Sequence, residues 1–194
     1  EAVLAKYAVS LPEGSLIETP KDDADFARVE NVLFLTNRDA LDAMKEEARA
    51  RGYAPRIMTD TMHGEARAVA GEICAALRAA PPSSALLYGG ETTVSLGAHA
   101  GRGGRNQELA LASLARLTDD ELVLAFASDG KYATPHAGAL ADAETRAHAR
   151  AKNVDADAAL SAHASYDFFA ATGDALQTGL LESNVSDLVI ALKT

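Results

Sequence analysis

The sequence predicts an α/β fold, with a mostly parallel sheet covered by helices on both faces in three layers. Two observations predict it. Short apolar runs that fit buried strands alternate with stretches whose apolar residues recur at helical spacing. Glycine or polar residues follow most of these runs directly, as expected where a strand turns into a helix. The 194 residues, 48% of them apolar, suffice for one ordinary globular domain or two small ones.

Each expected element has a local signal for its start or its end. The apolar run VLFL fits a strand that ends at Asn37, and Gly52 stops the helix that follows. Two prolines at 81–82 end the next helix, and Phe168 with Phe169 fits the core face of a short helix. In chain order we expect strands at 32–35, 57–58, 85–88, 92–96 and 122–127, and helices at 39–51, 65–78 and 106–117.

The segment GRGGRNQE, from Gly101 to Glu108, is the strongest candidate for a binding site. Its glycines expose backbone N–H groups, the helix that starts near Asn106 adds its positive end, and the arginines supply charge and donors. This combination is typical of a site for phosphate or carboxylate. The alternative that the segment alone leaves open is a flexible glycine loop with solvated arginines.

Polar residues stand directly after four of the expected strands, where ligands bind in open α/β sheets. They are Asn37, Asp60, Glu91 and Asp129. Asparagine and aspartate also cap helices and start turns, and we keep that interpretation for Asn37 and Asp60. Glu91 is different, because glutamate is a poor turn former and here follows the diglycine at 89–90, which lets a ligand or another backbone come close.

Composition and charge narrow the classes of partner. The formal net charge of −10, without a basic stripe or an aromatic platform, argues against nucleic acid. No apolar run reaches the length of a membrane span and the start does not fit a secretory signal, so we expect a cytoplasmic protein. Because salt screens exposed charges, anion binding depends on local cations, here Arg102, Arg105 and Lys131. Cys74 lies among apolar residues at helical spacing and is expected in the core.

Five segments occur in an order and spacing that match a known family: GGETTV at 89–94, GRGGRNQE at 101–108, SDG at 128–130, AGA at 137–139 and SNVSDL at 183–188. They resemble the carboxyl-terminal half of glycerate 2-kinases, the part that ends in the MOFRL domain. The resemblance implies transfer of a phosphoryl group from ATP to D-glycerate, which gives 2-phosphoglycerate and ADP, with Mg²⁺ as the divalent metal. It also implies a preceding lobe that this chain lacks, so we expect the isolated chain to be inactive.

The same resemblance implies a domain plan and a set of partners. Residues 1–30 are expected to be a remnant or linker from the preceding lobe, and residues 31–194 an α/β lobe with the MOFRL domain at about 85–194. The expected partners are glycerate, a nucleotide and the missing lobe of the same protein, and a homo-oligomer is possible. Neither nucleic acid nor a membrane is expected.

Site residues are carried over from the family motifs position by position. Arg105 and Glu91 are the expected catalytic residues, and Glu91 and Asp129 are the candidate ligands of Mg²⁺. Glu108 is expected to brace the glycine loop or Arg105. The expected residues for binding substrate and phosphate are Gly89, Gly90, Thr92, Arg102, Gly103, Gly104, Asn106, Asp129 and Lys131.

Three segments depart from the family pattern. The departing residues are Lys131, Tyr132 and Ala133 after SDG, His163 and Ala164 in place of a polar pair, and Leu180, Leu181 and Glu182 in place of part of GPTGTNV. The changes indicate either a retuned substrate site or the loss of part of the activity. His136 and His163 lack the spacing of metal ligands and are interpreted as ordinary loop or surface histidines.

Two other classes of function stay open. Related chains are often labelled hydroxypyruvate reductases, but a nicotinamide-dependent reductase needs G-x-G-x-x-G directly after a first strand. GRGGRN lacks that spacing, and the expected strand ending at Asn37 has no glycines after it. The second alternative is a non-catalytic module that binds a ligand or a partner.

Overall fold

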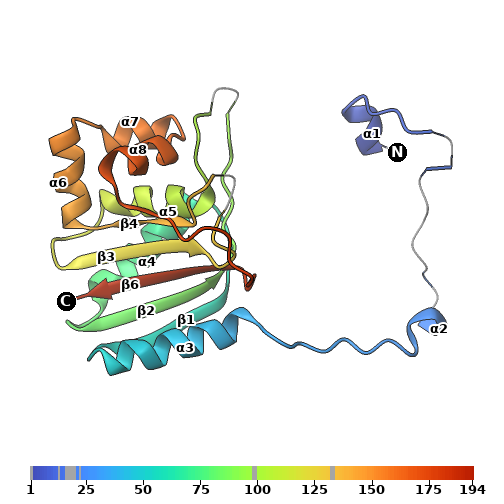
Figure 1. Cartoon of the computed structure of the whole chain (residues 1–194), viewed down its shortest axis with the longest axis horizontal. Coiled ribbons are helices and arrows are strands. Elements are labelled where there is room, and N and C mark those ends of the chain that lie inside the picture. The colour runs from blue at the N-terminus through green and yellow to red at the C-terminus, as the bar shows by residue number, and fades with distance from the viewer. Residues whose placement is uncertain (1, 13, 16–20, 22, 98–99, 132–133) are drawn as a thin grey trace. The chain divides into compact units, whose positions relative to one another are not determined.

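The computed structural model describes residues 2–12, 14–15, 21, 23–97, 100–131 and 134–194. The chain divides into two compact units, Glu1–Phe34 and Leu35–Thr194. The first contains the short helices α1 (Ala2–Lys6) and α2 (Asp23–Phe26) (Figure 1).

The strand predicted at 32–35 is wrong. The segment has no strand structure, and its four apolar side chains are exposed, up to 95% at Phe34. The apolar run has the composition of a strand, but its backbone forms no ladder with any strand that the structure describes. A strand needs such a partner for its N–H and C=O groups, and composition does not supply one.

The second unit is built on a six-stranded sheet with the order β1-β2-β6-β3-β4-β5. β1 and β2 pair in parallel, whereas β6 is antiparallel to both β2 and β3, and β4 is antiparallel to β3 and β5. The sheet is therefore mixed and mostly antiparallel, and the prediction of a mostly parallel sheet is wrong. The strands are β1 (Ala54–Met62), β2 (Ser84–Gly90), β3 (Glu121–Ala127), β4 (Gly138–Ala141), β5 (Ala175–Leu176) and β6 (Asp187–Lys193).

The placement of β6 explains this error. The last strand of the chain inserts between β2 and β3, so that Leu87 and Leu124 both pair with Ile190. An apolar run has the same composition in either direction, and its periodicity does not reveal which way it enters a sheet. β2 and β3 still point the same way, because each is antiparallel to β6, and their carboxyl ends lie at one edge of the sheet (Figure 1).

The strand predicted at 92–96 is also wrong. Only an isolated bridge between Glu65 and Thr93 forms in this described part of the chain. Next to this bridge, the Ala66 N–H donates to the Thr93 carbonyl at 2.9 Å. This hydrogen bond holds the start of α4 against the segment after β2.

Helices cover the two faces of the sheet unequally. Alternate residues of β2 face opposite ways: Leu87 packs with Leu41 of α3, whereas Leu86 and Tyr88 belong to the core shared with α4 and α5. α3 lies along β1 and β2, and α4, α5 and the later helices occupy the other face (Figure 1). No helix among the described residues is long and apolar enough to cross a membrane. The helices of this unit are α3 (Asn37–Ala50), α4 (Ala66–Ala79), α5 (Arg105–Leu114), α6 (Ala143–Lys152), α7 (Ala156–Ser161) and α8 (Ser165–Thr172).

Several local predictions are confirmed. The helix predicted at 39–51 is present as α3, and at its start the Asp39 carboxylate accepts from the Thr36 N–H at 2.8 Å. Phe168 and Phe169 lie on the core face of α8, with 2% and 0% of their surfaces exposed. Cys74 is buried in α4, where it acts as a small apolar residue.

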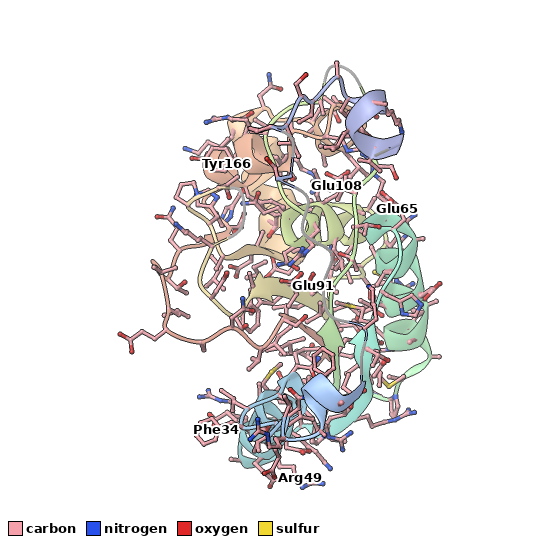
Figure 2. The ribbon with its side chains drawn as sticks, turned by 90° about the vertical axis from the view of Figure 1, so that its right-hand side faces the viewer. Phe34, Arg49, Glu65, Glu91, Glu108 and Tyr166 are labelled. Carbon is pink, nitrogen blue, oxygen red and sulfur yellow. The ribbon has the colours of Figure 1, made fainter. Side chains whose placement is uncertain are left out.

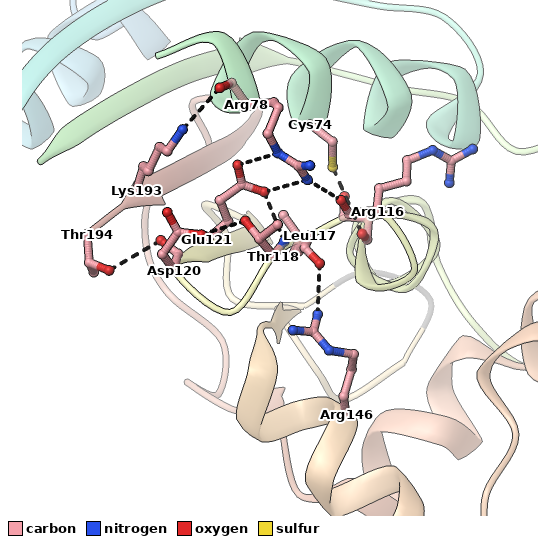
Figure 3. A network of polar contacts seen from close by, with 11 residues as sticks. Cys74, Arg78, Arg116, Leu117, Thr118, Asp120, Glu121, Arg146, Lys193 and Thr194 are labelled. Atoms are coloured by element: carbon pink, nitrogen blue, oxygen red, sulfur yellow. Dashed lines mark hydrogen bonds and ion pairs between the residues drawn. The ribbon is translucent and has the colours of Figure 1, made fainter. Parts of the chain in front are cut away.

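A polar network fastens the edge of the sheet where β3 begins and β6 ends (Figure 3). Arg78 of α4 donates to both carboxylate oxygens of Glu121, at 2.8 Å and 3.0 Å, and to the Arg116 carbonyl at 2.6 Å. The Thr118 N–H donates to the same carboxylate at 3.0 Å, and Lys193 donates to the Arg78 carbonyl at 3.0 Å. Burial disfavours the charge of Glu121, but these hydrogen bonds outweigh burial and hold its pKa below the ordinary value.

Candidate active site

The candidate site lies at the opposite edge of the sheet, where β2 and β3 end and β6 begins. Gly90 pairs there with Asp187, and Asp187 pairs with Ala127, so the three strands bring these ends into one row. A pocket with a volume of about 470 Å³ opens beside this row. The predicted site residues that line it are Glu91, Thr92, Gly103, Gly104 and Arg105. Figure 2 faces this side of the unit and labels Glu91 and Glu108.

The two glycines that end β2 are explained by the close approach of another segment of the chain. Gly90 has a φ of +140°, and a Cβ there would lie 2.2 Å from the carbonyl oxygen of Met62 in β1. A Cβ on Gly89 would lie 3.1 Å from the Asn37 side chain. The Glu91 N–H donates to the Met62 carbonyl at 2.8 Å and so fixes Glu91 at the pocket. Gly89 and Gly90 themselves do not line the pocket.

Arg105 is held at the start of α5 by two carboxylates. Its guanidinium makes a two-point contact with Asp187, through Nε and, at 3.2 Å, through Nη2. The same Nη2 lies 3.2 Å from Glu91 Oε1. Burial raises the pKa of Asp187, and the hydrogen bonds from Arg105 only partly offset it. Asp187 thus orients the guanidinium toward the pocket in a fixed position, as two-point contacts with arginine do.

Glu108 braces the site, but with partners that the sequence interpretation did not name. Its carboxylate is 2% exposed and accepts from Arg67 Nε of α4 at 2.7 Å. His163 Nδ1 lies 2.9 Å from the same oxygen and 3.0 Å from Arg67 Nη2. Arg67 also donates to the Leu160 carbonyl. Both Glu108 and His163 line the pocket, so the interpretation of His163 as an ordinary loop or surface histidine is wrong.

Thr92 contributes a polar group without a partner. Its side chain is 2% exposed and lines the pocket, and its hydroxyl makes no hydrogen bond with any residue that the structure describes. The amide oxygen of Asn106, in the first turn of α5, is buried and lacks a described partner as well. A buried polar group without a partner is costly, by about 1–3 kcal/mol, unless a ligand or water satisfies it.

Arg102 lies outside the pocket. It pairs with Asp167 at 2.5 Å, and its guanidinium stacks over the Tyr166 ring at 4.4 Å. Asp129 and Lys131 do not line the pocket either: the Lys131 N–H donates to the Asp129 carboxylate at 3.2 Å within the turn after β3. Tyr132 and Ala133 lie outside the described residues.

His136 lies in a loop, as interpreted, but it is buried and not at the surface. It is 5% exposed, it stacks on Tyr166 at 4.6 Å, and its Nδ1 lies 3.0 Å from the Gln107 amide. Burial lowers its pKa below the ordinary value, because the charged imidazolium loses its hydration.

The described residues contain no group of three or more histidine, cysteine, aspartate or glutamate side chains that could hold a metal ion by itself. Glu91 fits the role of a single carboxylate ligand, because its side chain is 56% exposed at the pocket. Mg²⁺ is commonly held by one or two carboxylates together with substrate phosphates. Asp129 does not share the pocket with Glu91, so the structure does not bring the two candidate ligands together there.

Sequence reasoning missed three residues of the site, namely Arg67, His163 as a pocket residue, and Asp187. Asp187 belongs to the SNVSDL segment, so a motif pointed to it without giving it a role. His163 stood out only as a departure from the family pattern. Arg67 carried no local signal, because an arginine in the first turn of a helix is usually solvated.

Comparison with known proteins finds one matching family model and relatives that carry two kinds of name. The MOFRL family model matches residues 84–187. Glycerate 2-kinase of Pyrococcus horikoshii is 36% identical over 93% of this chain and 43% of its own length. A putative hydroxypyruvate reductase of Agrobacterium vitis is 36% identical over 96% of this chain and 46% of its own length.

The fold is similar to that of a solved glycerate kinase from Thermotoga maritima. The TM-score is 0.82 at 31% identity, over 100% of this chain and 49% of that structure. The chain thus spans less than half the length of the relatives named here. From the family model and these similarities together, the chain belongs to the MOFRL family and is a relative of the glycerate 2-kinases.

Proposed function

We propose that this chain is the carboxyl-terminal lobe of an ATP-dependent glycerate 2-kinase, which converts D-glycerate and ATP to 2-phosphoglycerate and ADP. In this proposal residues 31–194 form the lobe, residues 1–30 connect it to a preceding lobe, and the protein acts in the cytoplasm. The observation that carries the proposal is the position of Arg105, which Asp187 and Glu91 hold at the pocket beside the glycine loop.

The pocket supplies part of the groups that phosphoryl transfer requires. That reaction depends mainly on positioning and on neutralising the charge of the transferred group. Arg105 provides a guanidinium that is 15% exposed and fixed from behind by Asp187. The Thr92 hydroxyl and the N–H groups of Gly103 and Gly104 provide neutral donors close to it, whereas the Gly101 N–H already donates to the Ala162 carbonyl. These groups can bind the phosphoryl group or the carboxylate of glycerate without moving.

The proposal includes Mg²⁺ and ATP because the resemblance to glycerate 2-kinases implies them. Mg²⁺, when bound with the nucleotide, would neutralise phosphate charge, and Glu91 is the pocket carboxylate with accessible oxygens. Glu108 is less suited to that role, because Arg67 and His163 already occupy its buried carboxylate. Asp129 stays a candidate second ligand only in a protein whose preceding lobe adds to the site.

The reductase alternative rests on the names of relatives such as the Agrobacterium vitis protein. No strand directly precedes the glycine loop at 101–104, since none is assigned among the described residues between β2 and α5. A dinucleotide fingerprint needs a strand directly before its glycines. A non-catalytic ligand-binding module is consistent with the pocket, and only an activity measurement separates it from the kinase.

A chimera tests the proposal directly. The part of the Thermotoga maritima relative that this chain does not cover is joined to this chain, and the product is assayed with ATP, Mg²⁺ and D-glycerate. We expect 2-phosphoglycerate from the chimera, and none from the 194-residue chain alone. Turnover by the chain alone at a few per second, within the usual kinase range, would contradict the need for a second lobe. A folded chimera that oxidises NADH with hydroxypyruvate and forms no ADP would favour the reductase.

A further inference from the structure

Two residues of the glycine loop, Gly101 and Gly103, lie against the segment that joins α7 to α8. Neither has φ in the left-handed region, so neither position requires glycine for its backbone conformation. A Cβ at Gly101 would lie 2.9 Å from the Cβ of Ala164, and a Cβ at Gly103 would overlap the Ser165 hydroxyl. Both positions therefore require glycine because residues 162–165, which we call the α7–α8 turn, approach the loop so closely.

Hydrogen bonds join the glycine loop to this turn and to the start of α8. The Gly101 N–H donates to the Ala162 carbonyl at 2.8 Å, and the Tyr166 N–H donates to the Arg102 carbonyl at 3.0 Å. The Arg102 side chain pairs with Asp167, the next residue of α8. The first N–H groups of a helix need acceptors from outside it, and the loop supplies one to α8. The path of the loop is therefore set by the turn and by the first residues of α8.

The other side of the loop forms part of the pocket wall. Gly103 and Gly104 line the pocket together with Arg105. The N–H groups of the two glycines make no hydrogen bond with any residue that the structure describes. An anion in the pocket can accept from such N–H groups at the start of a helix. The position of the loop thus decides where these two donors stand in the pocket.

Ser165, the first residue of α8, contributes the atom that lies closest to the missing Cβ of Gly103. It is fully buried, and its hydroxyl makes no hydrogen bond with any described residue. Because a buried hydroxyl without a partner is costly, hydrogen bonding does not explain why serine stands here. Its size does, since the hydroxyl fills the space that a side chain at position 103 would occupy. Ser165 does not line the pocket, so it can affect a ligand only through the loop.

We propose that Ser165 is a positioning residue for anion binding in the pocket: its hydroxyl packs against Gly103 and fixes how far the N–H groups of Gly103 and Gly104 reach toward the ligand. The proposal rests on the proposed function only in taking the ligand to be anionic. Donors that are held in place before the ligand arrives bind it more tightly, because no loop has to be ordered on binding. A displacement of about 0.5 Å is enough to spoil such an arrangement.

The test moves one heavy atom across this contact. Sulfate affinity is measured by calorimetry, and folding by the melting temperature, in the 194-residue chain and its variants. Gly103→Ala places a methyl group where the Ser165 hydroxyl lies, and we expect the affinity to fall by about tenfold, the value of one hydrogen bond to a charged group. Ser165→Ala alone leaves the loop more room and should weaken binding less, by about twofold to threefold.

The double variant Gly103→Ala with Ser165→Ala should bind sulfate more tightly than Gly103→Ala alone. The nearest atom that remains beside the new Cβ is the His163 carbonyl oxygen, at 3.3 Å, so the overlap is gone. We expect an affinity within about threefold of that of the unmodified chain. Ser165→Ala thus has opposite effects in the two backgrounds, which a general loss of stability does not produce.

Gly101→Ala is the matched control, because its Cβ would meet other atoms of the same turn. These are the Cβ of Ala164 and, at 3.1 Å, the Ala162 carbonyl oxygen. The variant should also lower sulfate affinity, but Ser165→Ala should not restore it. The Gly104 amide signal, followed by NMR, should shift on addition of sulfate in the unmodified chain and in the double variant at position 103.

A second titration with D-glycerate separates this proposal from the proposed function. Restored sulfate binding in the double variant, with no binding of D-glycerate to any variant, supports the role of Ser165 and counts against glycerate as substrate. Binding of both anions that Gly103→Ala leaves unchanged supports the substrate and overturns the role of Ser165. A loss in Gly103→Ala that persists in the double variant overturns it as well, and so does the failure of sulfate to bind the unmodified chain.

Discussion

The ladder between β3 and β6 has an arginine–carboxylate contact at each end, Arg78 with Glu121 at one and Arg105 with Asp187 at the other. Both carboxylates are nearly inaccessible, at 2% and 1% exposure. At Glu121 several donors converge, and its pKa lies below the ordinary value. At Asp187 the effect of burial exceeds that of the hydrogen bonds, and the pKa of Asp187 lies above the ordinary value. Both ends thus pair an arginine with a buried carboxylate, and they differ in how completely that carboxylate is hydrogen-bonded.

From this difference we interpret the Arg78–Glu121 contact as structural and the Arg105–Asp187 contact as part of the proposed site. The Glu121 end is closed, because Arg78 donates to both carboxylate oxygens and the Thr118 N–H donates to one of them. The Asp187 end borders a pocket, and the Thr92 hydroxyl there has no described partner. Shifted carboxylates beside a cleft are typical of sites that bind or react. We therefore expect substitutions at the Glu121 end to lower stability and substitutions at the Asp187 end to lower activity.

The largest effect is expected for Arg105→Ala in the active chimera. Removing one preorganised donor of an active site lowers kcat by about 10²-fold or more. If Arg105 stabilises the transferred group more than the bound substrate, as we propose, the loss should appear mainly in kcat. Kinetics and melting temperature are measured on the same preparation. A lower melting temperature with an unchanged kcat per folded molecule would contradict a catalytic role and show that Arg105 only stabilises the fold through Asp187.

Glu121→Ala should have the converse effect. It removes the shared acceptor of Arg78 and Thr118, and we expect a loss of about 2–3 kcal/mol in the free energy of unfolding. This is below the loss for a fully buried pair, because the Arg78 side chain is half exposed and can be hydrated. Urea unfolding of the 194-residue chain measures it. Sulfate affinity at the pocket should stay unchanged, and a parallel loss of affinity would show that the two ends are coupled.

The contributions of the two ends to the free energy of unfolding should also change in opposite directions as pH falls. The pKa of Glu121 is lowered in the folded state, so the stability it adds is present above its unfolded value of 4.5 and is lost as pH falls through the folded value. The pKa of Asp187 is raised from 3.8, so its contribution grows as pH falls through its folded value toward 3.8. Unfolding free energies between pH 6 and 3 should therefore decline less steeply in Glu121→Gln than in the unmodified chain. In Asp187→Asn the decline should be steeper.

The smallest effect is expected for Arg102→Ala. Arg102 lies in the glycine loop and Arg105 directly follows it. The Arg102 side chain, however, is 70% exposed, and its partner Asp167 is exposed too. Exposed pairs contribute little, so we expect kcat of the chimera to stay within about twofold. A large fall in kcat would mean that Arg102 leaves Asp167 and enters the site when substrate binds.

The sequence by itself determined several of the local elements and the family. The helical spacing and end signals of 39–51 and 65–78 predicted both ends of α3 and of α4 to within two residues, and the apolar runs predicted β2 and β3. The motifs around Glu91 and Arg105 identified the relatives of the chain. The pocket lining includes both of these residues. Each of these signals is local, because caps, turns and side-chain spacing act over a few residues.

Only the tertiary structure decided how these elements pair and which charges meet. The direction of β6 depends on where the chain returns to the sheet, which no periodicity encodes. Asp187 meets Arg105 across 82 positions, and His163 meets Glu108 across 55. Such contacts form only after helices and strands have packed, because a charged side chain has no local preference for a partner so distant in sequence. For the same reason the exposed segment at 32–35 has the composition of a strand without a strand to pair with.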